Sequence, residues 1–171
     1  MNCKELTVER LVVKDPRGKG QVEISGREIV LRDDRGVTRI ELQLDYRDGC
    51  PSIALSDAIR QERIKLNVNS SGGANISLLN EHDRAAVWLT TECGTRICLY
   101  DQRDNARLDC SIDEDDGDPI IELGDRHGHT RAELTLDHES GAVIATYNAE
   151  ETKLWAAPAK EEKVQPQQKE G

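Results

Sequence analysis

The densest group of potential metal ligands is the acidic run at residues 113–118, in which five of six positions are Asp or Glu. Its aspartates are Asp113, Asp115, Asp116 and Asp118. Carboxylate oxygens are the ligands that Ca²⁺ prefers. However, Gly117 is fifth in the run, whereas the EF-hand loop has glycine sixth and a distal glutamate that is absent here. The run therefore favours a solvated acidic turn, and a Ca²⁺ site is the alternative.

Two histidines, His127 and His129, flank one glycine and could share a zinc or nickel ion with a third ligand. The nearest further histidine, His138, lies at the far end of the next expected strand. At ~3.3 Å per residue it is roughly 20 Å from the turn, which argues against a site within one chain.

The five cysteines are odd in number and irregularly spaced: Cys3, Cys50, Cys93, Cys98 and Cys110. Cys93 and Cys98 are too far apart for a CxxC redox pair, and the spacing matches no zinc ribbon. We expect free thiols, a reducing compartment, an outward-pointing Cys98 and a Cys110 that acts as a small hydrophobic residue.

Two tryptophans are candidate binding residues. Trp88 lies between two inward-facing residues, Val87 and Leu89, so alternation places it on the polar face, and we expect Trp155 to occupy the equivalent place near the C-terminus. An exposed Trp can stack on a sugar or anchor a protein partner. The competing interpretation is that Trp88 covers neighbouring aliphatic side chains.

A repeated pattern must position all of these residues. Alternating apolar residues lead to an acidic residue, a tight turn, a basic residue and more alternating apolar residues, most clearly at 29–44 and 121–136. We align the repeats on the first residue of each turn and call this residue the anchor. The anchors are Asp15, Asp33, Asp57, Asn80, Asp101, Asp125 and, degenerately, Tyr147, at spacings of 18 to 24 residues. Such periods indicate a repeat architecture.

The turn sequence D-x-x-G fits a type I turn whose fourth residue adopts the left-handed conformation and closes a bulged hairpin. Asp83 and Asp104 can replace that glycine, whereas Arg60 and Glu150 are poor substitutes. The sequence therefore predicts that the turns with Arg60 and Glu150 differ in shape from the others.

A row of arginines follows the turns: Arg39, Arg63, Arg107 and Arg131. The row could bind a polyanion. The acidic anchors nearby favour cross-strand ion pairs instead, each contributing less than ~1 kcal/mol.

The pattern predicts an all-β, antiparallel hairpin meander of about fourteen short strands, in about seven repeats of ~22 residues, over residues 1–157. One face is Ile, Leu and Val, and no helical segment is available to cover it. We therefore expect a homo-oligomer whose copies cover each other's apolar face, with a trimer favoured over a dimer. A monomeric β-solenoid is the alternative. Residues 158–171 are predicted to be a disordered polar tail.

The turns from Asp33 to Arg39 and from Asp125 to Arg131 resemble the D-x-x-G-x-x-R turns of uncharacterised bacterial β-hairpin-repeat proteins. They are also distantly similar to YD-repeat shells, in which a Tyr-Asp-x-x-Gly turn recurs. Only Tyr100-Asp101 reproduces that dipeptide, without the glycine. The similarity extends from Leu11 to Ala156 and implies a structure but no activity.

The net charge of −10 argues against binding to nucleic acid or an anionic membrane. No apolar signal region opens the chain and no stretch reaches membrane-spanning length, so we expect a cytoplasmic protein, with signal-free export as the alternative. Because the catalytic motifs of P-loop, α/β-hydrolase, dinucleotide-binding and HExxH proteins are absent, we expect a non-enzymatic structural or assembly protein, part of an oligomer or larger complex. The alternatives are a glycan-, ion- or protein-binding module that uses Trp88 or the acidic run, and an enzyme whose site forms between chains.

Overall fold

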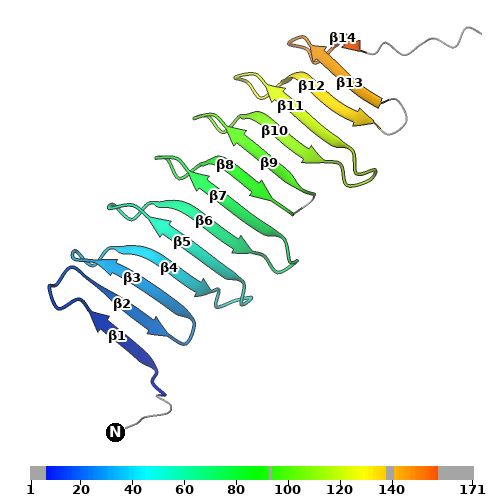
Figure 1. The fold of residues 1–171 in the computed structure, drawn as a ribbon. Coiled ribbons are helices and arrows are strands. Elements are labelled where there is room, and N and C mark those ends of the chain that lie inside the picture. Colours follow the sequence, from blue (N-terminus) through cyan, green and yellow to red (C-terminus); the bar gives the residue numbers. More distant parts are fainter. Residues whose placement is uncertain (1–6, 93, 138–140, 158–171) are drawn as a thin grey trace, which may run out of the picture.

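The computed structural model describes residues 7–92, 94–137 and 141–157. These residues form one open sheet of fourteen strands, each antiparallel to the strand before it in sequence (Figure 1). The predicted hairpin meander is confirmed. The solenoid alternative is wrong, because every strand pairs with its neighbours in sequence instead of stacking on a later coil. Within the described residues, no helix is long and apolar enough to cross a membrane.

The strands are short. Their bounds are β1 Arg10–Lys14, β2 Gly20–Ser25, β3 Glu28–Asp33, β4 Thr38–Leu44, β5 Pro51–Ser56, β6 Glu62–Val68, β7 Ala74–Leu79, β8 Ala85–Thr90, β9 Arg96–Tyr100, β10 Ala106–Ile112, β11 Pro119–Gly124, β12 Thr130–Asp137, β13 Gly141–Tyr147 and β14 Lys153–Ala157.

The repeated turns join each odd-numbered strand to the following even-numbered one, so all of them lie along one side of the sheet (Figure 1). We call this side the turn edge. The last anchor there is Asn148, not Tyr147. The Asn148 side-chain oxygen accepts the backbone N–H groups of Glu150 (3.1 Å) and Thr152 (2.8 Å), and Glu151 has the positive φ. Only a side chain with an oxygen near the backbone can make these bonds, and a tyrosine cannot.

The turn that contains Arg60 does not differ from the glycine-containing turn at Asp33, so the prediction that it differs is wrong. The Asp57 carboxylate accepts the N–H groups of Ile59 (2.9 Å) and Gln61 (3.1 Å), as Asp33 accepts those of Arg35 and Val37. Arg60 adopts φ +71°, in the left-handed range of Gly36 at +76°. The anchor's hydrogen bonds therefore impose the turn even where the residue type disfavours it.

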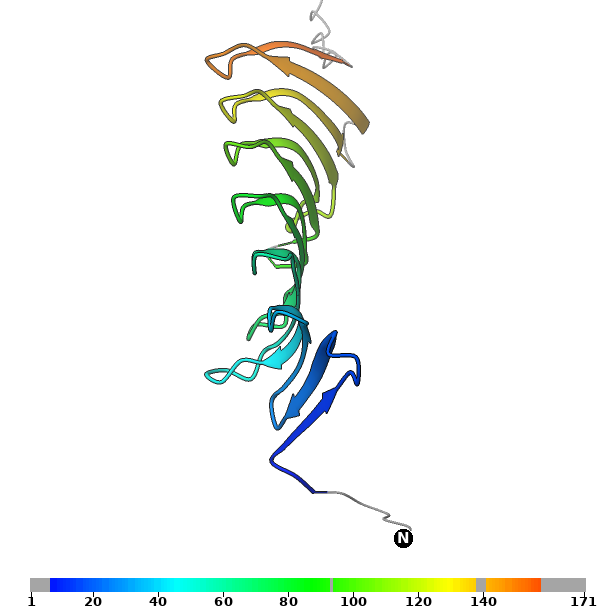
Figure 2. The ribbon, with the colours of Figure 1, turned by 90° about the vertical axis from the view of Figure 1, so that its left-hand side faces the viewer.

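One face of the sheet, the apolar face, carries a continuous row of aliphatic residues across all fourteen strands. In register, the row is Leu11, Ile24, Ile29, Leu42, Ile53, Leu66, Ile76, Leu89, Ile97, Cys110, Ile121, Leu134, Ile144 and Ala157. Most of these side chains are half-exposed; Leu42 is 38 % and Ile121 39 % exposed. Seen from the side, the described residues form a single curved layer (Figure 2). Among the described residues, the apolar face therefore has no second layer.

The most deeply buried apolar residues lie on the opposite, polar face: Val30, Ala54, Cys98 and Ala145. All four belong to the central row of that face and lie in register beside longer side chains on a neighbouring strand, as Val30 lies between Glu23 and Glu41. Small side chains between long ones are shielded without a second layer. Alternation places polar side chains on this face, but the face is not uniformly exposed, because these small residues form a buried central line.

Candidate functional site: the turn edge and the apolar face

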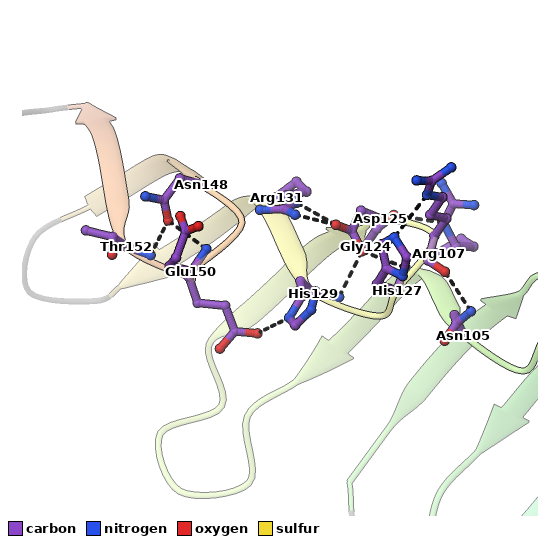
Figure 3. A network of polar contacts seen from close by, with 12 residues as sticks. Asn105, Arg107, Gly124, Asp125, His127, His129, Arg131, Asn148, Glu150 and Thr152 are labelled. Atoms are coloured by element: carbon purple, nitrogen blue, oxygen red, sulfur yellow. Dashed lines mark hydrogen bonds and ion pairs between the residues drawn. The ribbon is translucent and has the colours of Figure 1, made fainter.

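The anchor carboxylates organise the turn edge. Asp125 accepts the backbone N–H groups of His127 (2.7 Å) and His129 (3.2 Å), and Nε of Arg131 donates to its second oxygen at 2.8 Å (Figure 3). Burial alone would raise the pKa of Asp125. These donors outweigh burial, and the pKa lies far below its ordinary value.

The arginine row sits at bulges. In β4, β6, β10 and β12 the register skips Arg39, Arg63, Arg107 and Arg131. The predicted ion pairs with the anchors are present: Arg39–Asp33 at 3.5 Å, Arg63–Asp57 at 2.9 Å from Nε, Arg107–Asp101 at 3.6 Å, and Arg131–Asp125. The bulge thus turns each arginine back toward its own anchor.

Three of these arginines also bond to the next hairpin. Nε of Arg39 donates to the Ser56 carbonyl and Nε of Arg107 to the Gly124 carbonyl, both at 2.9 Å, and Arg63 donates to the Asn80 carbonyl. Each therefore links an anchor to the backbone beside the following turn. This explains physically why an arginine recurs six residues after the anchor.

Successive turns also contact each other directly. Arg84 pairs with Asp104 at 3.1 Å. Figure 3 shows two further contacts: His129 lies 3.0 Å from Glu151, and the Asn105 amide donates to the Arg126 carbonyl at 2.9 Å. Arg84 and His129 each lie four residues after an anchor. Each contacts a residue that lies three residues after the next anchor. Turn chemistry thus repeats between hairpins as well as within them.

Among the described residues, neither candidate metal site forms a cluster of ligands. In the acidic run, Asp113 accepts the N–H of Asp115 (2.8 Å) and Asp116 accepts the N–H of Asp118 (2.9 Å). Across residues 7–92, 94–137 and 141–157, no three His, Cys, Asp or Glu side chains gather as a metal site. His129 contacts Glu151, and His138 lies outside the described residues. In this geometry Asp113 and Asp116 serve as acceptors within the turn.

Cys98 points to the polar face as predicted, but it is buried, at 1 % exposure. Its Sγ lies 3.0 Å from Asp109, which also pairs with Arg96 at 3.2 Å. Burial, and then the bond to Asp109, raise the pKa of Cys98 to about 11, so the thiol stays protonated and unreactive at neutral pH. Cys50, Cys98 and Cys110 are free, and Cys3 and Cys93 lie outside the described residues.

The sequence pattern does not reveal a row of three acidic residues on the polar face, which begins at Asp109. Asp109, Glu122 and Glu133 are neighbours in register on β10, β11 and β12. Glu133 accepts the Tyr147 hydroxyl at 2.8 Å, and burial followed by this bond raises the pKa of Tyr147 to about 12. Only the strand register, which the sequence pattern gives approximately, brings these acids together.

The two tryptophans lie on opposite faces, which corrects the sequence prediction. Trp88 is half-buried on the polar face, in register between Ser77 and Cys98. Trp155 pairs with Thr146, which places it on the apolar face, where it is 55 % exposed. The last anchor lies one residue later than assumed, so the parity of β14 is reversed.

The apolar face is hollowed into shallow grooves near the side opposite the turn edge. One groove of about 450 Å³ is lined by Ile24, Ile29, Leu42, Leu44 and Ile53, and a second of about 270 Å³ lies over β5 to β7. Both have almost wholly apolar walls. They are continuous with the aliphatic row and offer depressions into which other aliphatic side chains can pack.

No model of a known protein family matches this sequence, and no curated protein is significantly similar to it.

Proposed function

We propose that this protein is a non-enzymatic structural protein that assembles with copies of itself through the apolar face and forms a rigid β-sheet scaffold. The observation that carries the proposal is the half-exposed aliphatic row that crosses all fourteen strands. Soluble monomers rarely expose contiguous apolar patches of more than a few hundred Å².

The size of the face supports a stable interface. At ~4.8 Å between strands the sheet spans roughly 65 Å, and five residues of strand cover roughly 17 Å, which gives roughly 1,100 Å² per copy. Two such faces together exceed the ~1,600 Å² of a standard protein interface.

A second copy is the partner whose chemistry matches best, because its face has the same aliphatic composition. Two or three apolar faces packed ~10 Å apart form the core that one chain lacks. A trimeric prism is our preferred arrangement, and a two-sheet sandwich is the alternative. The polar face and the turn edge then point outward and keep the assembly in solution.

A charge placed on the apolar face tests this proposal. Leu42→Asp is expected to dissociate the oligomer, because an uncompensated charge within the interface costs several kcal/mol. The matched control is Gln43→Asp, one residue along the same strand on the polar face, which should leave the oligomer intact. Size-exclusion chromatography with light scattering measures both. If the Leu42 and Gln43 variants have the same mass as the wild type, the apolar face is not the interface.

A further inference from the structure

The two ends of the sheet are open strand edges. Among the described residues, β1 pairs only with β2, and β14 only with β13. Because Asp15 bonds to Gly20 across the first hairpin and strand residues alternate, the backbone N–H and C=O of Val12 point away from β2. The unpaired backbone groups of an edge strand readily accept another strand.

The internal registers follow one rule. In six successive hairpin junctions, the residue eight after an anchor pairs with the residue three before the next anchor. The pairs are Glu23–Val30, Glu41–Ala54, Lys65–Ser77, Trp88–Cys98, Asp109–Glu122 and Glu133–Ala145. Ala156 lies eight residues after Asn148, and Val12 lies three before Asp15. The rule therefore gives Ala156 a partner equivalent to Val12.

The number of strands makes this pairing geometrically possible. With fourteen strands, β14 runs in the direction of every even strand, so a β1 placed beside it is antiparallel. In this register Ala157 lies beside Leu11 and Trp155 beside Val13, all on the apolar face. The aliphatic row would therefore continue from one copy into the next without a change of face.

The charges of the two ends are complementary. The first turn carries Arg17 and Lys19 beside its anchor Asp15; Arg17 lies 3.6 Å from Asp15, and its side chain is 80 % exposed. The last turn carries Glu150 and Glu151. In the proposed register these two turns are neighbours on the turn edge, as the turns joined by the Arg84–Asp104 pair are.

Two lysines also lie at these ends. Lys153 of β14 lies over the Tyr147 ring, 5.8 Å from its centre, and Lys14 lies at the end of β1. The register brings both lysines near the two glutamates of the last turn. Opposite charges would therefore attract each other across the junction between the two copies.

We propose that β14 of one copy pairs with β1 of a second copy, so that copies of this chain join head to tail into a longer continuous sheet. The contact is heterologous, and because sheets twist, repeated addition gives a helical filament and not a closed ring. This inference does not depend on how the apolar face is covered.

The test is sedimentation velocity of the full chain over a range of concentrations at low salt. The wild type is expected to give a series of integer multiples of the smallest unit. Val12→Pro removes an outward N–H, leaves the bonds to β2 intact and should reduce the series to the smallest unit. Val12→Thr keeps the N–H and should retain the series, and circular dichroism verifies that both variants keep their strands.

A charge exchange provides a second readout. The double variant Arg17→Glu/Lys19→Glu should weaken the head-to-tail association by about tenfold, and adding Glu150→Lys/Glu151→Lys should restore it. A wild type of one size at all concentrations, or a Val12→Pro series identical to that of the wild type, overturns the inference. Failure of this inference can be told apart from failure of the proposed function. Leu42→Asp tests the mass of the smallest unit, whereas Val12→Pro tests only whether multiples of that unit form.

Discussion

The anchor residue organises each turn of this protein. In six of the seven turns its side-chain oxygen accepts two backbone N–H groups, and in four repeats its carboxylate also pairs with the arginine six residues later. Asparagine makes the same backbone bonds at Asn80 and Asn148. The turn therefore requires a side-chain oxygen at the anchor position, whereas the ion pair with the following arginine requires a charged carboxylate there.

Arg60→Gly is expected to stabilise the protein. Arg60 is held at φ +71°, which costs an L-residue roughly 1–2 kcal/mol, whereas glycine adopts it freely but loses more backbone entropy. The net gain should be about 0.5–1 kcal/mol in urea unfolding. Gly36→Ala is the reciprocal variant: its new Cβ would meet open space, so its change in stability reports backbone strain minus the entropy gain, without a steric clash. An Arg60→Gly variant less stable than the wild type would contradict this account.

Stability should fall in acid. Burial raises the pKa of Asp57, but the N–H groups of Ile59 and Gln61 and the Arg63 guanidinium outweigh it, so the folded-state pKa lies below the unfolded value. A lowered folded pKa contributes stability above the unfolded pKa of about 4, and this contribution is lost as the pH falls through the folded value.

Asp57→Asn isolates this titration, because asparagine keeps the backbone bonds of the turn but carries no charge. The difference in unfolding midpoint between the wild type and this variant should be largest at neutral pH and should shrink below about pH 4. Unfolding curves at several pH values measure it. A difference that grows in acid would show that the charged form of Asp57 does not stabilise the fold.

At the scale of the element, the bulged hairpin is the unit that repeats. A D-x-x-G turn, two alternating strands and a returning arginine recur, and these features are visible in the sequence. For this reason the strands, their alternation and the turns were predictable. The bulge was not, because a skipped residue such as Arg63 looks like an ordinary strand position. The misplaced anchor at Tyr147 then reversed the face of Trp155.

The candidate sites were less predictable than the strands. The acidic run contains potential metal ligands, and the structure shows that two of its carboxylates, Asp113 and Asp116, accept N–H groups within the turn. The Cys98–Asp109 contact and the row of three acidic residues depend on exact pairing between strands, and a one-residue error in register removes them. Residue spacing within one segment therefore predicts the local turns and strands. Contacts between segments depend on the exact strand register, which only the structure shows.

Arg63→Ala tests the link between hairpins. The Arg63 side chain is 29 % exposed and donates to both Asp57 and the Asn80 carbonyl, so its loss should cost about 1 kcal/mol in unfolding free energy. Ala86→Arg restores the repeated motif where the chain has alanine and should stabilise the protein by a smaller amount. A neutral Arg63→Ala variant would mean that strand pairing alone holds adjacent hairpins together.

At the scale of the whole molecule, fourteen strands in a single layer leave the aliphatic row half-exposed along its entire length. Each strand contacts only the strands beside it, so the core of one chain is a thin line on the polar face. In our account the apolar face is the main interface and the two edge strands set the direction of growth.

The mass of the wild-type chain in solution, measured by native mass spectrometry at neutral pH, tests the central claim most directly. The account predicts a defined oligomer of two or three copies of the 19.1-kDa chain as the smallest species, with three preferred. A single 19.1-kDa species at every concentration, with its strands intact, would contradict it, because the apolar face would then be stable in water without a partner.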